Sequence, residues 1–506
     1  GVYNGVIQLA GTGEFLGYFA VNDADLTFTQ RLQQLLFTRA QLANLVDINP
    51  TVFTNVFVDK SGIVYTATSG TNRNGMKKHS TNGGNMFKTN VWSYDTLTDV
   101  YVDDDGLIYT SSSEGYINVY SKNGEEIFSF GSYVTTVDIS GLFTSLPSLA
   151  VDRNGNIWCV DGSKGYLQSF KPTEYAQMVY SAMNLYEEGR YSEAMVQWNE
   201  VLKLNQMSIL AHNGVGKAYL HDEEYEASLE HFKVANNKDF YSQAYWEVRN
   251  AWLQKWLGPI LGVVALLIVL RGVVKVIDRK KGGHIAAAGK RVKEKLGGLP
   301  VLKDMIYALR TPRHPMDYYY EIRKHRQGSI LSTTVIYLLF FIDFMAFKTQ
   351  KGFIYQTMKV EDMDIGSIVL GFFILLGLFI LCNYLVTSIN DGDGTFKQIY
   401  MIPAYGLMPA MISILVVTLV SYVLTYNEAF LLTIVLIIGI TWSVITIFIG
   451  LQTVHDYTFG ETVRSILLTV IFMIIVAVIG IIISIMWDSL YSFLTSVGKE
   501  MIQNVM

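Results

Sequence analysis

Two acidic clusters hold the residues of this sequence best suited to chemistry, because carboxylates can bind calcium or act as acids and bases. One is the consecutive triplet Asp103–Asp105, and in the other Asp391 and Asp393 alternate with glycines. An EF-hand loop needs alternating ligands and a glutamate at position twelve, where the second cluster has Ile402. We therefore interpret both clusters as turns, the second of them rich in glycines with positive φ, and the sequence predicts no metal site.

Common catalytic and nucleotide-binding motifs are missing from the sequence. It has no Gly-x-x-x-x-Gly-Lys-Ser/Thr loop, no Gly-x-Ser-x-Gly elbow and no His-Glu-x-x-His pair. The two cysteines, Cys159 and Cys382, are too few for a disulfide framework. The sequence therefore predicts a protein that is not an enzyme and that has no cofactor.

Two polar residues, Asp343 and Asn383, lie near the middle of long apolar runs. A polar group in lipid needs a partner, and such residues often mark functional contacts. One acidic residue is too few for an ion pathway. We expect both side chains to make helix contacts, either within this chain or to a neighbouring permease.

The apolar runs themselves predict six transmembrane helices. The chain is 50% hydrophobic and 16% charged, with a mean hydropathy of +0.28, which excludes a purely soluble protein. About 20 apolar residues cross a bilayer, and six suitable runs lie at 257–277, 330–347, 365–389, 403–425, 430–451 and 465–486. We expect Pro403 and Pro409 to begin the fourth helix, where a missing backbone donor costs least.

The distribution of charge predicts the orientation of these helices. Residues 1–255 hold 18 Lys and Arg against 28 Asp and Glu, a net charge of −10, which leaves +5 for the rest of the chain. Fourteen Lys and Arg lie from Lys275 to Arg326. Because cationic residues beside a span mark the cytoplasmic side, we expect the N-terminal half to be extracellular. Since the sequence begins with Gly1 rather than Met, we also expect it to start after a cleaved signal or further in.

The N-terminal half repeats one pattern three times: a β-rich run, a turn with Asp and Gly, and a second β-rich run. The copies lie at 56–66, 100–110 and 149–158, and each predicts a β-hairpin. Their turn aspartates, Asp59, Asp103 and Asp152, are 44 and 49 residues apart, a period typical of propeller blades. Residues 116–131 and 1–18 each predict the outer hairpin of a blade.

These segments resemble NHL-type blades, so residues 1–173 predict an extracellular β-propeller. A closed propeller needs four to eight blades, and we therefore expect this one to be incomplete at its N-terminal end. Residues 27–46 predict a helix in a loop between blades. Tyr101, Tyr116 and Trp158 are candidates for contact with an oligosaccharide or a protein, although blade aromatics more often fill a core or rim.

Residues 174–256 resemble tetratricopeptide repeats (TPR) and predict a helical neck. A shift of 34 residues pairs three positions of each repeat: Ala194 with Ser228, Trp198 with Phe232, and Val201 with Ala235. We expect these side chains to form the core between helices rather than a binding surface. Residues 240–256 predict a closing helix that continues into the first span.

Three segments of the membrane half resemble the Yip1 family of membrane proteins. They are 305–323 followed by Gly328-Ser329, 390–397 before Pro403–Pro409, and Trp442 with 454–458. The resemblance implies a five-helix membrane domain at 330–490, which would follow an anchor helix at 257–277 and a basic cytoplasmic linker at 278–329 containing an interfacial helix. A tail at 491–506 would end a multidomain chain. Because the family is described as scaffolds and trafficking-linked proteins, the resemblance implies protein contacts rather than a reaction.

The cytoplasmic segments supply most of the candidate contact residues. Their aromatic and cationic side chains suit the inner leaflet or a neighbouring subunit, although a solvated basic face would have the same composition. The candidates for a partner interface are His314, Pro315, Tyr318, Tyr319, Arg323, Asp343, Asn383, Asp391, Asp393 and His455.

The combination of an external propeller, TPR and a Yip1 domain resembles proteins encoded beside carbohydrate ABC importers in Gram-positive bacteria. It implies a non-enzymatic accessory or scaffold subunit of the cell membrane that contacts ABC permease subunits, an extracellular solute-binding protein and membrane lipids, with an oligosaccharide as a further ligand. The alternative is an extracellular sensor that signals through the cytoplasmic linker. The formal net charge of −5 argues against a nucleic-acid partner.

Overall fold

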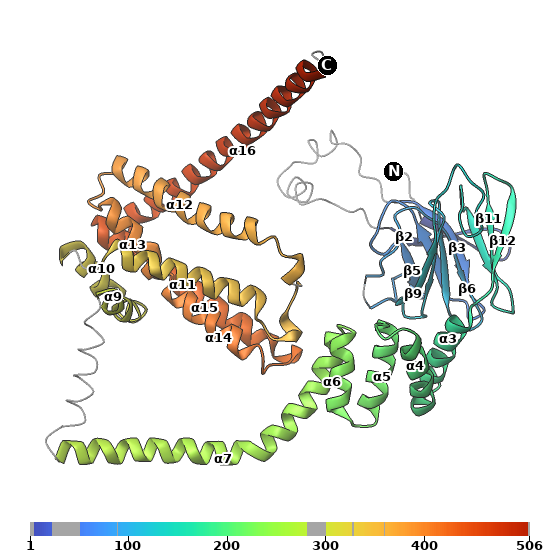
Figure 1. Cartoon of the computed structure of the whole chain (residues 1–506), viewed down its shortest axis with the longest axis horizontal. Coiled ribbons are helices and arrows are strands. Elements are labelled where there is room, and N and C mark those ends of the chain that lie inside the picture. Colours follow the sequence, from blue (N-terminus) through green and yellow to red (C-terminus); the bar gives the residue numbers. More distant parts are fainter. Residues whose placement is uncertain are drawn as a thin grey trace. The chain divides into compact units, whose positions relative to one another are not determined.

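The computed structural model describes residues 5–22, 51–88, 90–280, 300–325, 328–358 and 360–503 (Figure 1). The chain divides into two compact units, Gly1–His221 and Asp222–Met506. The helix predicted at 27–46 and the basic stretch 281–299 lie outside the described residues.

The described strands of the first unit form four separate antiparallel sheets, and each strand pairs with its neighbours in the sequence (Figure 1). The four sheets are β1 (Gly5–Leu9) with β2 (Phe15–Val21); β3 (Phe53–Val58), β4 (Val64–Thr68) and β5 (Met76–His79); β6 (Leu97–Val102), β7 (Ile108–Ser112), β8 (Tyr116–Tyr120) and β9 (Glu126–Gly131); and β10 (Ser148–Val151), β11 (Ile157–Asp161) and β12 (Tyr166–Phe170). The five predicted hairpins are confirmed.

The turn aspartates explain why the repeated pattern forms hairpins. In each copy the Oδ1 atom of the aspartate accepts backbone N–H groups from residues two and four positions later, at 2.8–3.0 Å. A glycine with a φ of +77° to +82° then completes the turn, a conformation that glycine adopts without strain. Hydrogen bonds led by that from the Asn156 side chain lower the pKa of Asp152 to about 2, so its carboxylate stays ionised.

Among the described residues, the sheets form an open series rather than a closed ring. Strand β6 contacts both β3 and β10, and the buried side chains of Tyr65 and Ile108 fill the space between the sheets. The last sheet leaves Trp158 and Leu167 43% and 63% exposed. A closed propeller is therefore not shown.

Helices follow the sheets, as the TPR resemblance predicts. In the first unit, α3 (Glu174–Glu187), α4 (Tyr191–Leu204) and α5 (Ile209–His221) pack in sequence. Trp198 is buried against Gly214, where an added Cβ atom would lie 2.1 Å from the indole nitrogen. The second unit begins with α6 (Tyr225–Val234). The six residues paired by the 34-residue shift are all buried, which confirms their core role.

The six predicted spans are found as helices, and the chain is a multi-pass membrane protein. They are α7 (Lys238–Lys280), α11 (Ile330–Thr349), α12 (Ile365–Ile389), α13 (Phe396–Gly406) with α14 (Met408–Val420), α15 (Ala429–His455) and α16 (Phe459–Gln503). Shorter elements are α9 (Pro300–Ala308), α10 (Pro315–His325) and the 3-10 turns η1 (Phe353–Tyr355), η2 (Val360–Asp362) and η3 (Tyr426–Glu428). As predicted, the closing helix after the repeats continues into the first span, because α7 is a single helix of 43 residues.

One predicted helix boundary is wrong. The fourth span starts at Phe396 rather than Pro403, because Thr395 and Gln398 form a capping box that begins α13 seven residues earlier. Pro403 lies inside α13, whereas Pro409 is in the first turn of α14, as predicted. Helix α16 continues from the last span through the predicted tail as far as Gln503.

The helices of the membrane domain pack into one bundle. In Figure 1, α11, α14 and α15 run side by side, and α12 and α16 pack against each other. Helix α10, the 390–395 loop and the C-terminal residues of α15 meet at one end of the bundle, which we call the α10 end. The opposite end, where η1 and η3 lie, is the η3 end.

Candidate functional site

Helix α10 packs along α15 through a stripe of three buried side chains, Tyr318, Tyr319 and Ile322. This spacing of one, three and four residues covers one face of a helix. The Tyr319 hydroxyl donates a hydrogen bond to the carbonyl of Ile402 on α13, at 3.0 Å. On α15, Gly450 leaves room for the Tyr319 ring, because an added Cβ would lie 2.7 Å from its Cζ atom. Two of the predicted interface residues, Tyr318 and Tyr319, are therefore core residues.

Arg323 connects three segments at the α10 end. Its Nη2 atom lies 3.1 Å from Asp393 Oδ2, and its Nη1 atom lies 2.6 Å from Asp456 Oδ1. The guanidinium also donates to the carbonyl of Thr453 at 3.4 Å. The hydrogen bond from Arg323 holds the pKa of Asp456 below its usual value, so the pair is ionised at neutral pH. One predicted interface residue thus ties α10 to the 390–395 loop and to the end of α15.

His455 lies inside the same cluster and is 2% exposed. Its ring stacks on Tyr457 at 5.1 Å, and its Nδ1 atom accepts a hydrogen bond from the Gly394 N–H at 3.2 Å. Because Nδ1 accepts, the neutral ring carries its proton on Nε2. That nitrogen is buried and has no hydrogen-bond partner among the described residues.

The glycines of the 390–395 loop serve close packing rather than a left-handed turn. We predicted a turn of glycines with positive φ, and this is wrong, because Asp391 is the residue of that loop with positive φ (53°). At Gly392 an added Cβ would lie 2.5 Å from His455 Nδ1, and at Gly394 it would lie 2.4 Å from His455 Cε1. The loop therefore needs small residues where it covers the imidazole ring. Tyr319, Arg323, Asp393, His455 and Asp456 together are the α10 cluster.

The two polar residues predicted inside apolar runs lie outside this cluster. Asn383 Nδ2 donates to Thr469 Oγ1 at 3.2 Å, which joins α12 to α16 within the chain. Asp343 lies on α11, and its Oδ2 atom is buried without a hydrogen-bond partner in the part of the chain that the structure describes. Asn383 therefore makes a helix contact within the chain, one of the two kinds expected. Asp343 makes no such hydrogen bond through Oδ2 within the described residues.

The remaining candidates are spread over both units. His314 and Pro315 lie at the start of α10, where the His314 ring is exposed and 4.0 Å from Asp317. In the sheets, Tyr101 packs on Phe57 with ring centroids 4.8 Å apart, and Tyr116 stacks on Tyr94 at 4.2 Å. Trp158 is exposed on β11 and donates to Asp152 Oδ2 at 3.2 Å. Of the three aromatic ligand candidates, Trp158 has the most exposed side chain.

Sequence reasoning missed a second cluster, at the η3 end. Arg249 on α7 forms a two-pronged ion pair with Glu428, at 2.6 and 2.8 Å, and donates to the Val423 carbonyl at 2.7 Å. The Tyr245 hydroxyl donates to the Tyr422 carbonyl at 2.9 Å. These contacts fasten the first half of α7 to the loop between α14 and α15. The sequence signal that could have indicated this cluster is Glu428, a single glutamate in the four-residue segment 426–429 between two apolar runs.

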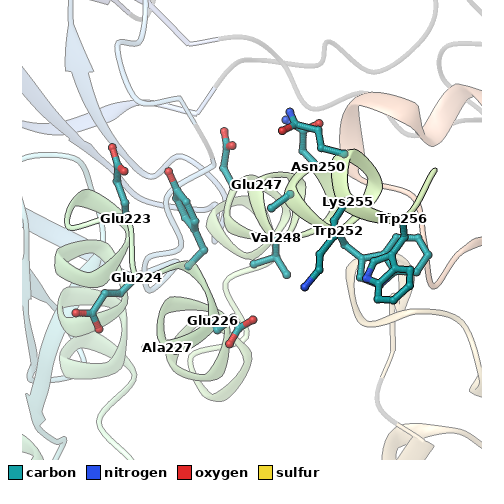
Figure 2. Close-up of a pocket in the computed structure, with 13 residues that line it drawn as sticks. Glu223, Glu224, Glu226, Ala227, Glu247, Val248, Asn250, Trp252, Lys255 and Trp256 are labelled. Atoms are coloured by element: carbon teal, nitrogen blue, oxygen red, sulfur yellow. The ribbon is translucent and has the colours of Figure 1, made fainter. Parts of the chain in front are cut away.

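A groove of about 900 Å³ lies between α6 and α7, also unforeseen. Figure 2 shows carboxylates and indoles around it, and its charged and aromatic lining comprises Glu223, Glu224, Tyr225, Glu226, Glu247, Trp252, Lys255 and Trp256. Four carboxylates against one ammonium make the groove acidic. Trp252 and Trp256 precede the apolar stretch of α7, where aromatic residues mark a membrane interface.

Comparisons with known protein families identify a helical repeat before the membrane domain and a family domain within it. Residues 309–485 match the Yip1 domain, and residues 184–222 match a TPR repeat. No curated protein is similar enough to be matched to the chain. The Yip1 match includes every residue of the α10 cluster and Glu428 of the η3 end. The protein therefore joins a TPR repeat to a Yip1 domain in a single multi-pass membrane chain.

Proposed function

We propose that this protein is a non-enzymatic scaffold subunit of a membrane complex, and that its apolar helices and its TPR region hold other proteins together. The observation that carries the proposal is the apolar stretch of α7, in which no residue is buried among the described residues. The α10 cluster and the η3 contacts join elements within the chain. The exposed side chains of the α7 span are left for a neighbour in the membrane.

The complex that we propose is a carbohydrate ABC importer of a Gram-positive cell membrane. The support is the sequence resemblance together with the joint presence of a TPR repeat and a Yip1 domain. In this proposal the sheets at 1–173 are blades of an extracellular propeller that docks the solute-binding protein or a glycan beside the permeases. Tethering a partner in this way raises its local concentration to about the millimolar range.

The acidic groove between α6 and α7 supports a partner contact close to the membrane. Carboxylates attract Lys and Arg side chains, and exposed indole faces add cation–π attraction. Glu224 and Glu226 line the groove, whereas Glu230 lies on the same helix outside its lining. The three residues therefore provide a test and its matched control.

The test is purification of the tagged full-length chain in a mild detergent, with identification of the proteins that are recovered with it. We expect permease subunits and a solute-binding protein. The double variant Glu224→Lys and Glu226→Lys should recover at least several-fold less of one partner, and Glu230→Lys should recover the normal amount. Recovery of the chain alone, with oligosaccharide binding to the purified protein, would instead favour the extracellular sensor.

A further inference from the structure

A second groove, about 520 Å³ in volume, lies within the membrane domain and has only apolar residues in its lining. Five elements contribute to it, and the side chains that define its shape are Phe372, Leu376, Pro403, Phe448, Val470 and Met473. It does not include any residue of the α10 cluster. The groove is therefore a separate feature of the bundle.

The groove arises because the helices pack in two pairs. Helix α12 packs along α16, with the hydrogen bond from Asn383 to Thr469 between them. Helix α13 packs closely on α15, since an added Cβ at Gly406 would lie 2.3 Å from Ile447 Cγ1. Pro403 belongs to the α13 side of the groove and Leu376 to the α12 side. The space that remains between the two pairs is the groove.

Its surroundings define what can occupy it. All of its lining residues belong to the predicted spans or their caps, where hydrocarbon replaces water. An apolar cavity does not hold water, and unfilled space loses dispersion contacts on every side. The occupant must therefore be apolar and must enter from the bilayer.

The size of the groove discriminates between a lipid chain and a protein helix. Its lining extends from Val444 to Leu451 on α15 and from Ile466 to Met473 on α16, which is about 10 Å along each axis. A groove of this length would contact only about two turns of a helix. A flexible hydrocarbon chain can follow its walls and fill it.

Charge near the α10 end suits a phospholipid with its chain in the groove. Lys397 precedes Pro403 by six residues on α13, and Arg464 precedes Ile466 by two on α16; both cations are exposed. Cations at headgroup level attract lipid phosphate. We propose that this groove is a binding site for an acyl chain of a membrane phospholipid, whose headgroup lies at the α10 end.

The proposal is tested by counting lipids bound to the full chain. The protein is exchanged from phosphatidylcholine nanodiscs into detergent, passed through a sizing column and examined by native mass spectrometry. Leu376→Trp and Val470→Phe fill the groove and should reduce retained phosphatidylcholine by tenfold or more. Leu381→Trp and Val478→Phe, on exposed positions of the same two helices, should retain the wild-type amount.

A third kind of variant separates filling from damage to the fold. Phe372→Ala enlarges the groove, so it should keep its lipid even if it lowers the thermal midpoint. Equal lipid retention in the filling variants and their controls would overturn the proposal. Loss of lipid in all variants alike would also overturn it. If the filling variants lost self-association instead of lipid, a second copy of the chain would be the occupant of the groove, and the proposal would be wrong.

Discussion

Gly394 and His455 show how single residues determine the structure of the α10 end. The glycine places its N–H on the imidazole and leaves no room for a side chain. The same end contains Arg323, whose partners Asp393 and Asp456 are mostly exposed. Exposed ion pairs are each worth about 0–1 kcal/mol, so close packing of the loop on the ring outweighs the charges in stability.

Substitution of Gly394 should therefore destabilise the Yip1 domain. In Gly394→Ala the new Cβ would lie 2.4 Å from His455 Cε1, and the forced shift should cost about 1–3 kcal/mol. Gly377→Ala is the control, because no heavy atom lies within 4 Å of a Cβ added there. Thermal unfolding of the two variants in detergent checks this. Equal midpoints would contradict the packing argument.

His79 should make the folding stability of the first unit depend on pH. It is 4% exposed, its Nδ1–H donates to the Gly83 carbonyl and its Nε2 faces Thr66 Oγ1, both at 2.8 Å. Burial lowers the pKa of His79 from 6.5. Below pH 6.5 the unfolded chain therefore binds a proton that the folded chain does not, and stability should fall as the pH falls from 6.5 towards the lowered folded pKa.

The measurement is hydrogen exchange of β4 and β5 as a function of pH, corrected for the intrinsic rate. Protection should decrease below pH 6.5 in the wild type. His79→Gln, which has no titrating group, should lose this dependence even if its overall stability is lower. A wild-type slope that persists in the variant would show that another group is responsible.

Asp343 and Asn383 form a natural pair for comparison, because both are polar residues within spans. Asp343→Leu removes a buried oxygen without a described partner and should stabilise the isolated chain by about 1–3 kcal/mol. Asn383→Leu removes the bond to Thr469 together with an Oδ1 atom that has no partner among the described residues, so the two effects should offset each other and leave the stability within about 1 kcal/mol of the wild type. Thermal unfolding of both variants measures these changes. A loss of stability in Asp343→Leu would contradict the prediction and show that the Asp343 carboxylate has a partner within the chain.

At the scale of elements, α7 connects soluble and membrane parts of the second unit. Its first half is fastened to the η3 end, and its apolar second half is unburied. Tyr426 N–H also donates to Ser242 Oγ, at 3.0 Å. Because α7 is one continuous helix, contacts at the η3 end should govern how its first half is held relative to the Yip1 domain.

The ion pair between Arg249 and Glu428 is the strongest candidate for that coupling. The side chains are 10% and 24% exposed, so removal of one partner leaves a poorly solvated charge. Arg249→Ala should therefore destabilise the second unit by about 3 kcal/mol. It should also increase hydrogen exchange in η3 and the first half of α7. Glu247→Gln, two residues away on the same helix, should change neither quantity, and exchange unchanged in Arg249→Ala would contradict the coupling.

At the scale of the whole molecule, repetitive and apolar patterns were predictable, and contacts between distant segments were not. The spans follow from hydropathy because a helix in lipid must satisfy its own backbone. Hairpins follow from local Asp and Gly turns. By contrast, the contact of Arg323 with Asp456 joins residues 133 positions apart, and the sequence did not indicate that the two side chains meet. The start of α13 was mispredicted because a capping box outweighed proline as a boundary marker.

The proposed function requires the two ends of the Yip1 bundle to face opposite sides of the membrane, with α10 inside and the acidic N-terminal half outside. Both native cysteines are buried, so single cysteines introduced at Glu114 and Asp317, two exposed residues, can be labelled selectively. A membrane-impermeant maleimide applied to intact cells should label the cysteine at 114 and leave that at 317 unlabelled until the cells are lysed. Labelling of 317 in intact cells, or protection of 114, would contradict the account.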